Sequence, residues 1–242
     1  MPVQVVRHVD ADDLAHRVAH RLVDAIVARQ AGGRTVQLCL TGGGIAMRLY
    51  AELATALTKA DADPERLELW WGDERFVPTA SADRLAGPTL AMLAGRVTFD
   101  PARIHPMAAS DGSSDAAAAA ANYARELGDT RFDICLLGIG PDGHVASIFP
   151  RHPSSEPTTQ TVIAVHDSPK PPPERLSLTI PTLNRSAQVW FVASGADKAG
   201  VVAAAIGGDA SLPAGQVRGR DATVWLVDQD AAGKLPYFEC PF

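Results

Sequence analysis

The sequence predicts an α/β fold in which a mostly parallel β-sheet is flanked by helices. Short apolar runs alternate with helix-like segments along most of the chain, which is the pattern of parallel strands joined by crossover helices. The 242 residues and their 46% hydrophobic content can build a substantial core. This length suits one large domain or two small ones, and because no stretch resembles a linker we expect one domain over residues 1–242.

The amino-terminal part of the chain predicts a helix and then a strand, turn and helix. Asp10 is placed to cap a helix that begins near Ala11, because apolar residues recur at every fourth position after it. Residues 36–40 form a short apolar run that predicts a strand, followed by a glycine turn at 41–44. A helix-like segment from 45 to about 60 follows this turn.

The remainder of the chain continues the alternation. Ser114 is placed to cap an alanine-rich helix, since alanine has the highest intrinsic helix propensity. A polar loop is predicted from Gly72, and proline density predicts another loop at 167–173. We expect further strands at 67–71, 103–107, 132–139, 161–165, 176–180, 189–193 and 222–227, and further helices at 88–93, 114–127 and 198–206.

The composition argues against nucleic acid or an anionic membrane as a partner. The formal net charge is −6 and the sequence pI is about 5.6, whereas such partners require a basic surface. No apolar stretch is long enough for a membrane span, and no secretory signal pattern begins the sequence. Cys39, Cys135 and Cys240 form no paired motif and are expected to be reduced packing residues. We therefore expect a cytoplasmic protein in which an anionic substrate requires a local basic pocket.

Polar residues gather where the predicted strands end. Ligands of open parallel sheets bind outside the carboxyl ends of the strands, so these junctions are the candidate site. The first junction, Thr41, Gly42, Gly43 and Gly44, offers closely spaced backbone N–H groups and leads into the positive end of a helix. Such a turn can cradle a phosphate, although glycine turns also serve tight chain geometry alone, and no Walker motif follows.

The junction at 138–144 carries the pattern for general-base chemistry. Gly138, Gly140 and Gly143 have the spacing GxGxxG, but no acidic residue stands about 20 residues downstream in a second strand of a βαβ unit, as a dinucleotide site needs. Asp142 instead stands two residues before His144, where a carboxylate can orient an imidazole whose ordinary pKa is near neutrality. The sequence therefore predicts His144 as a general base with Asp142 as its partner.

Charged residues at the other junctions allow two interpretations each. Asp73 and Arg75 follow a buried strand, either as part of a surface ion pair worth about 0–1 kcal/mol or with Arg75 facing an anionic ligand while an acid holds its guanidinium. Arg175, just before the predicted strand at 176–180, and Lys198, after the strand at 189–193, are either solvated charges or part of one phosphate site with the glycine turn.

Taken together, several segments resemble the 6-phosphogluconolactonase family, within the glucosamine-6-phosphate deaminase/isomerase superfamily. The strongest are WGDERFVP at 71–78 and DICLLGIGPDGHVASIFP at 133–150, supported by RLSLT at 175–179 and SGADKAGVV at 194–202. The resemblance covers nearly the whole chain and implies a three-layer α/β/α fold. It also implies hydrolysis of 6-phosphogluconolactone, a phosphorylated sugar lactone, to 6-phosphogluconate in the oxidative pentose phosphate pathway.

The resemblance also assigns roles to residues. It implies that His144 is the catalytic base assisted by Asp142, and that the cations hold the anionic substrate beside the glycines. The substrate and phosphate residues expected on this basis are Thr41, Gly42, Gly43, Gly44, Asp73, Arg75, Arg175 and Lys198. Because a lactone is an activated ester and the sequence shows no HExxH or paired cysteines, we expect neither a metal nor a cofactor.

The sequence departs from the family pattern at two places. The turn reads TGGGIA at 41–46 where the family is close to SGGSTP, so backbone amides and Thr41 take the place of a hydroxyl. Leu85 stands where the family often carries an Asn that contacts substrate.

Two rival functions remain open. The first is an amino-sugar deaminase or aldose–ketose isomerase, but the deaminase branch follows its DGH element with a sequence like FNEP, and residues 148–150 here are Ile, Phe and Pro. The second is a sugar-phosphate sensor domain of a transcription regulator, which needs a DNA-binding segment, whereas about ten residues precede the first helix. The sequence sets no expectation for the oligomeric state.

Overall fold

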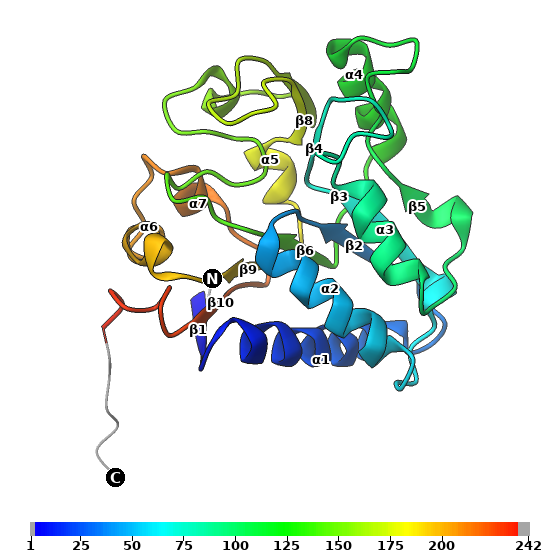
Figure 1. Ribbon diagram of the computed structural model, residues 1–242, viewed down its shortest axis with the longest axis vertical. Helices are drawn as coiled ribbons and strands as arrows, with labels where there is room; N and C mark the ends of the chain where they lie inside the picture. Colours follow the sequence, from blue (N-terminus) through cyan, green and yellow to red (C-terminus); the bar gives the residue numbers. More distant parts are fainter. Residues whose placement is uncertain (1–2, 237–242) are drawn as a thin grey trace.

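A seven-stranded sheet with all neighbours parallel forms the centre of the computed structural model, which describes residues 3–236 (Figure 1). The strand order is β1-β10-β9-β6-β2-β3-β5. The strands are β1 (Val3–His8), β2 (Val36–Leu40), β3 (Leu67–Trp71), β5 (Ile104–His105), β6 (Ile134–Leu137), β9 (Gln188–Ala193) and β10 (Ala222–Asp228).

Helices cover both faces of this sheet and give the three-layer arrangement. On one face α1 (Ala11–Gln30), α2 (Gly44–Leu57) and α3 (Ala86–Ala94) share a core with alternate strand residues such as Leu136 and Val192. The intervening strand residues, including Cys135 and Phe191, point into the other core. That core is covered by α4 (Ala116–Leu127), α5 (Ile180–Leu183), α6 (Ala199–Ile206) and α7 (Pro213–Gln216). The predicted fold class is confirmed.

A second, antiparallel sheet stands beyond the carboxyl ends of the main strands. Its order is β4 (Asp73–Arg75), β8 (Arg175–Leu178) and β7 (Val162–Val165). The backbone N–H of Leu178 donates to the carbonyl of Gly72 at 2.8 Å, which ties this sheet to the end of β3. The predicted loop from Gly72 is therefore wrong at 73–75, because three charged residues there pair as a strand with β8.

Two helix caps were predicted from the sequence, and one of them is displaced. The Asp10 carboxylate accepts hydrogen bonds from the N–H groups of Asp12 and Asp13, at 3.0 and 2.8 Å, so the predicted cap of α1 is confirmed. The cap of α4 is Asp115, whose carboxylate accepts from Ala118 N–H at 2.8 Å, and the assignment to Ser114 is wrong by one residue.

Other boundaries differ modestly from expectation. The strand β1 pairs in parallel with β10 at the sheet edge and was not predicted, because its run VQVVRH lacks a clear alternation. Short 3₁₀ turns precede β3, β5, the 156–161 loop and α6; they are η1 (Pro64–Arg66), η2 (Pro101–Arg103), η3 (Pro153–Ser155) and η4 (Ala196–Lys198).

Within residues 3–236, no helix combines the length and apolarity that crossing a membrane would require. Cys240 lies outside the described residues, whereas Cys39 and Cys135 are buried free thiols.

The strand order fixes where a ligand site is expected. After β2 the chain adds β3 and β5 on one side, and from β6 onward it adds strands on the other side of β2. The crevice of such a sheet lies outside the carboxyl ends of the two strands where the order reverses. Here these strands are β2 and β6, which lead into the glycine turn and the loop at 138–144.

Candidate active site

A cleft of about 300 Å³ opens at the carboxyl ends of β2 and β6. Residues from all four predicted junctions line it together with two residues of the 167–173 loop. The predicted site residues among its walls are Thr41, Gly42, Gly43, Gly44, Asp73, Arg75, His144, Arg175 and Lys198. Asp142, the remaining predicted site residue, is not part of the cleft wall but contacts His144 from the same loop.

His144 is held by one ring nitrogen and presents the other. Its Nδ1 lies 2.5 Å from Oδ1 of Asp142. The loop closes on itself because Gly140 N–H donates to the carbonyl of His144 at 3.0 Å and Gly143 N–H donates to that of Gly140 at 2.9 Å. Among the described residues nothing hydrogen-bonds to Nε2 of His144, so that nitrogen is the one left to act on a ligand.

The surroundings of His144 favour its neutral form. Burial lowers the pKa of His144 below its ordinary value; the Asp142 hydrogen bond and charge oppose this, and the positive charge of Lys170 adds to it. Burial also works against ionisation of Asp142, but the hydrogen bond from His144 and the charges nearby outweigh it, so the pKa of Asp142 lies below its usual range. A neutral imidazole that donates from Nδ1 to a carboxylate carries a free lone pair on Nε2.

Lys170 is a residue of the cleft that sequence reasoning missed. Its Nζ lies 3.4 Å from Nδ1 of His144 and 3.6 Å from Oδ1 of Asp142, and it lines the cleft. It comes from the proline-rich loop, whose sequence predicts only a loop. The segment DSPKPPPER contains a lysine among prolines, and this unusual position was the signal that could have found it.

The glycine turn forms another part of the cleft wall. Gly43 has a φ of 108°, which strains any residue with a side chain, and it precedes α2 without a side-chain cap. The first N–H groups of α2 therefore remain available at the positive end of the helix. A Cβ on Gly42 would lie 2.6 Å from a methyl carbon of Leu85, so Leu85 packs against the turn. This geometry suits a bound phosphate.

Thr41 has a structural task within the turn. Its Oγ1 accepts a hydrogen bond from Gly138 N–H at 3.3 Å, which joins the turn to the loop of His144. Its backbone exchanges two hydrogen bonds with the hydroxyl of Tyr50, at 2.9 and 2.8 Å. The hydroxyl oxygen of Thr41 thus joins the two loops as an acceptor, and its O–H group has no acceptor among the described residues.

Arg175 and Asp73 meet at Ser147. The Ser147 hydroxyl donates to Oδ2 of Asp73 at 2.7 Å, and Nη1 of Arg175 lies 3.5 Å from the same hydroxyl. The other nitrogens of Arg175 donate to main-chain carbonyls: Nη2 to Lys170 at 2.8 Å and Pro171 at 3.1 Å, and Nε to Pro172 at 3.1 Å. Most donors of this buried guanidinium therefore hold the loop that carries Lys170.

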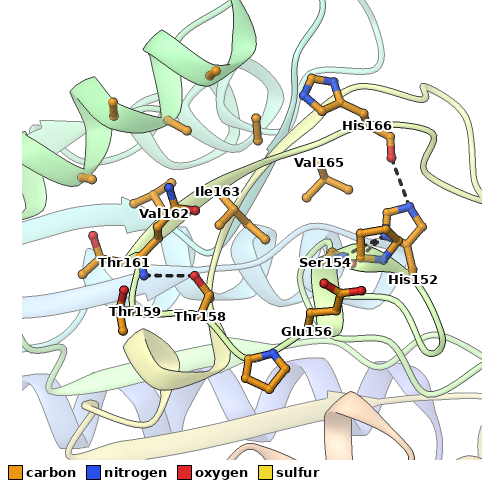
Figure 2. Close-up of a pocket in the computed structure, with 18 of the residues that line it drawn as sticks. His152, Ser154, Glu156, Thr158, Thr159, Thr161, Val162, Ile163, Val165 and His166 are labelled. Atoms are coloured by element: carbon orange, nitrogen blue, oxygen red, sulfur yellow. Dashed lines mark hydrogen bonds between the residues drawn. The ribbon is translucent and has the colours of Figure 1, made fainter.

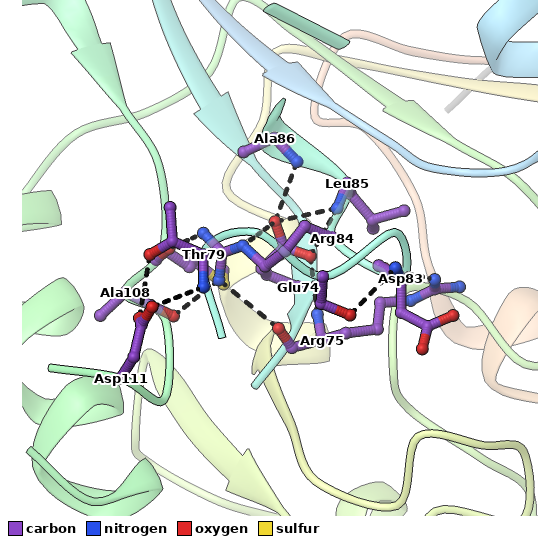
Figure 3. Close-up of polar contacts among 11 residues, drawn as sticks. Glu74, Arg75, Thr79, Asp83, Arg84, Leu85, Ala86, Ala108 and Asp111 are labelled. Carbon is purple, nitrogen blue, oxygen red and sulfur yellow. Dashed lines mark hydrogen bonds and ion pairs between the residues drawn. The ribbon is translucent and has the colours of Figure 1, made fainter. Parts of the chain in front are cut away.

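Glu74, next to Arg75, stabilises the loop before α3 (Figure 3). Its fully buried carboxylate accepts N–H groups from Arg75 at 2.7 Å, Leu85 at 2.8 Å and Ala86 at 2.9 Å, and lies 3.5 Å from Nε of Arg84. The guanidinium of Arg75 donates instead to the carbonyl of Asp83 at 2.9 Å. The hypothesis that an acid holds the Arg75 guanidinium is wrong, because the adjacent carboxylate binds backbone amides.

Lys198 reaches the cleft from the turn after β9. Asp228, at the end of β10, accepts from the Ser194 hydroxyl at 2.5 Å and from Gly195 N–H at 3.2 Å, which fixes this turn. Gly195 has a φ of 104°, so the turn requires a glycine there. No hydrogen bond or ion pair to Nζ of Lys198 occurs within the described part of the chain, and its charge is available to an anion.

A larger cleft lies elsewhere on the molecule (Figure 2). It has a volume of about 1140 Å³ between α4 and the segment from His152 to Asp167, which includes β7. Alanine, threonine and proline make up half of its lining, which also includes His152 and His166, and none of the predicted site residues lies there. Within residues 3–236 the smaller cleft brings together a histidine, cations and free backbone amides, and we therefore take it as the candidate active site.

Comparison with known proteins decides the family. The model of the family described as glucosamine-6-phosphate isomerases/6-phosphogluconolactonase matches residues 9–225. The chain is 45% identical to the 6-phosphogluconolactonase of Streptomyces coelicolor, covering 96% of this chain and 95% of that protein. The chain belongs to the 6-phosphogluconolactonase family. It is also 43% identical to the 6-phosphogluconolactonase of Mycobacterium tuberculosis, covering 94% of this chain and 96% of that protein.

Solved structures of the family have the same fold. A crystal structure of 6-phosphogluconolactonase from Thermotoga maritima superimposes with a TM-score of 0.83 at 27% identity, covering 94% of this chain and 100% of that one. The family resemblance expected from the motifs at 71–78 and 133–150 is thereby confirmed. Among residues 3–236 no group of three or more His, Cys, Asp or Glu side chains is arranged to hold a metal ion.

Proposed function

We propose that the chain hydrolyses 6-phosphogluconolactone to 6-phosphogluconate with His144 as general base. The observation that carries this proposal is the free Nε2 of His144 in a cleft whose walls include the glycine turn and Lys198. A base on one side and an anion site on the other match a lactone with a remote phosphate. The names of the relatives support the same substrate.

In the proposed reaction Nε2 of His144 removes a proton from water while the water oxygen bonds to the lactone carbonyl carbon. The Nδ1–H bond to Asp142 keeps the imidazole oriented and stabilises the imidazolium that forms. When the bond between the carbonyl carbon and the ring oxygen breaks, the imidazolium returns the proton to that oxygen. Lys198 and the amides of the turn hold the phosphate and align the carbonyl.

The segment after the DGH element favours lactone hydrolysis over deamination. Ring opening of an amino sugar uses a carboxylate, and residues 148–150 offer none. Phe149 is fully buried there, with its ring centroid 4.7 Å from that of His144. We keep the deaminase as the second candidate because the family model covers both activities.

We also keep the cytoplasm as the proposed compartment, since the described cysteines are free thiols.

Proton release from fresh 6-phosphogluconolactone tests this function. The wild-type protein should accelerate release above spontaneous hydrolysis, and His144→Ala should lose about 10²- to 10⁴-fold of that rate, as expected for a missing general base. Asp142→Asn should lose less, because Asp142 orients the ring and stabilises the imidazolium but does not itself take the proton from water. Ammonia release from glucosamine 6-phosphate, measured on the same samples, should be negligible. A rate on the amino sugar comparable with that on the lactone would favour the deaminase.

A further inference from the structure

We propose that Lys170 is a positioning residue for the catalytic pair: its ammonium fixes the Asp142 carboxylate and places a positive charge beside Nδ1 of His144. The inference deepens the proposed lactonase function, on which its kinetic readout rests. None of the similarities to known proteins assigns Lys170 a task.

The three groups form one compact cluster. Nζ of Lys170 lies 3.6 Å from Oδ1 of Asp142 and 3.4 Å from Nδ1 of His144, and the latter two atoms are 2.5 Å apart. Lys170 thus approaches the nitrogen that is already engaged and leaves Nε2 free. It acts through the pair and not on the reacting oxygen, which defines a positioning residue.

Buried contacts hold the backbone of Lys170 in place. Arg175 donates to its carbonyl at 2.8 Å and to the carbonyls of the next two prolines, both at 3.1 Å. The Ser168 hydroxyl donates to the same Lys170 carbonyl at 2.9 Å. Arg175 also lies over the ring of Phe149, 5.6 Å from its centroid, and that ring packs on His144. One buried guanidinium therefore connects the loop of Lys170 to the catalytic imidazole.

The charges around His144 oppose one another. Asp142 on its own loop and Asp73 on β4 stabilise the imidazolium, whereas Lys170 destabilises it. Arg175 on β8, Arg75 on β4 and Lys198 on η4 are the further cations that line the cleft. Lys170 is the cation that contacts the imidazole in the described structure. Its charge lowers the pKa of His144 and the pKa of Asp142, so His144 stays neutral and Asp142 stays ionised down to a lower pH.

Replacement of Lys170 by Met, which keeps the stem and removes the charge, tests this role. The pKa of His144 should rise in this variant, because a positive charge that repels the imidazolium is lost. NMR of histidine-labelled protein measures this pKa, and the spectrum of His144→Gln identifies the signal of His144. The acidic limb of the kcat/KM profile for the lactone should move to higher pH by the same amount. The loss on the high-pH plateau should be below about 10²-fold, less than that for a missing base.

Two controls separate the charge of Lys170 from other effects. Lys170→Arg keeps the charge and should retain the wild-type pKa of His144. Lys59→Met removes an exposed lysine near the end of α2 and should change neither the pKa nor the profile. An unshifted His144 in Lys170→Met, or an equal shift in Lys170→Arg, would overturn the proposal. If the wild-type protein failed to hydrolyse the lactone while the NMR shift appeared, the function would fall and the placement of Lys170 would stand.

Discussion

At the scale of single residues, the absence of a side chain at Gly140 decides how His144 is placed. A Cβ at this position would lie 2.0 Å from Nδ1 and Cε1 of His144 and 2.5 Å from Oδ1 of Asp142. Real atoms cannot approach so closely, so the imidazole and carboxylate occupy space that only glycine leaves open. Gly140 thus accommodates His144 and Asp142 because it has no side chain, and not through a special backbone conformation.

Gly140→Ala should therefore inactivate the protein while leaving its fold intact. The added methyl group displaces the imidazole, and a misplacement of about 1 Å in a catalytic group can cost about 10²-fold in rate. We expect kcat/KM on the lactone to fall by about 10²-fold or more, with the melting temperature and circular dichroism spectrum close to wild type. Gly87→Ala is the matched control, because a Cβ there meets no atom within 4 Å and the position is helical. Full activity in Gly140→Ala would show that the ring need not occupy its observed position.

At the scale of elements, the short strand β4 and the loop before α3 depend on one buried carboxylate. Glu74 collects three backbone N–H groups and the charge of Arg84, which in turn donates to the carbonyls of Met107 at 2.7 Å and Ala108 at 2.9 Å (Figure 3). These partners come from three separate segments of the chain. Removing the carboxylate leaves a buried guanidinium without its counter-ion and several amides without an acceptor.

Glu74→Ala should lower the free energy of unfolding by about 3–5 kcal/mol, the usual loss when one partner of a buried ion pair is removed. Equilibrium unfolding in urea measures this change. Arg48→Ala provides the comparison, because it breaks an exposed ion pair with Asp12 at 2.7 Å and should cost only about 0–1 kcal/mol. A loss below about 1 kcal/mol in Glu74→Ala would mean that solvent or neighbouring groups replace the carboxylate.

The elements also show what local sequence could predict. Strands buried on both faces, such as β2 and β3, are recognisable because a glycine stands within two residues of the end of each apolar run. The strand β4 consists of Asp73, Glu74 and Arg75, and nothing in three charged residues indicates burial. Its partner is β8, about 100 residues later, so pairing with a distant segment created the strand.

At the scale of the whole molecule, the tendency of ligands to bind at the carboxyl ends of parallel strands predicted from the sequence which residues would share one candidate site. His144, the glycine turn and Lys198 do line one cleft there. The same rule could not assign Lys170 or the many contacts of Arg175, because these depend on how the proline-rich loop folds back over the sheet. Which cation contacts the backbone, which contacts His144 and which is left for an anion therefore depends on the tertiary structure, and the charge pattern of the sequence does not predict it.

Phosphate recognition requires a local concentration of positive charge in a protein whose formal net charge is −6. The cleft gathers such cations, and Lys198 is the one whose Nζ has no partner among the described residues. Lys198→Ala should therefore lower kcat/KM for the phosphorylated lactone about 10- to 150-fold. This factor corresponds to a loss of about 1.5–3 kcal/mol of transition-state binding, the range for a hydrogen bond to a charged group. Hydrolysis of gluconolactone without phosphate should scarcely change in this variant.

Arg175→Ala should behave differently, and the contrast makes the test specific. Since Arg175 holds the loop of Lys170 through three main-chain carbonyls, its loss should reduce the rate on both lactones. The measurement is kcat/KM for both compounds in wild type, both variants and Lys59→Ala, each corrected for spontaneous hydrolysis. If Lys198→Ala weakened both lactones equally, Lys198 would serve the fold or the chemical step, and the phosphate would have to be bound by the backbone amides of the glycine turn and the remaining cations.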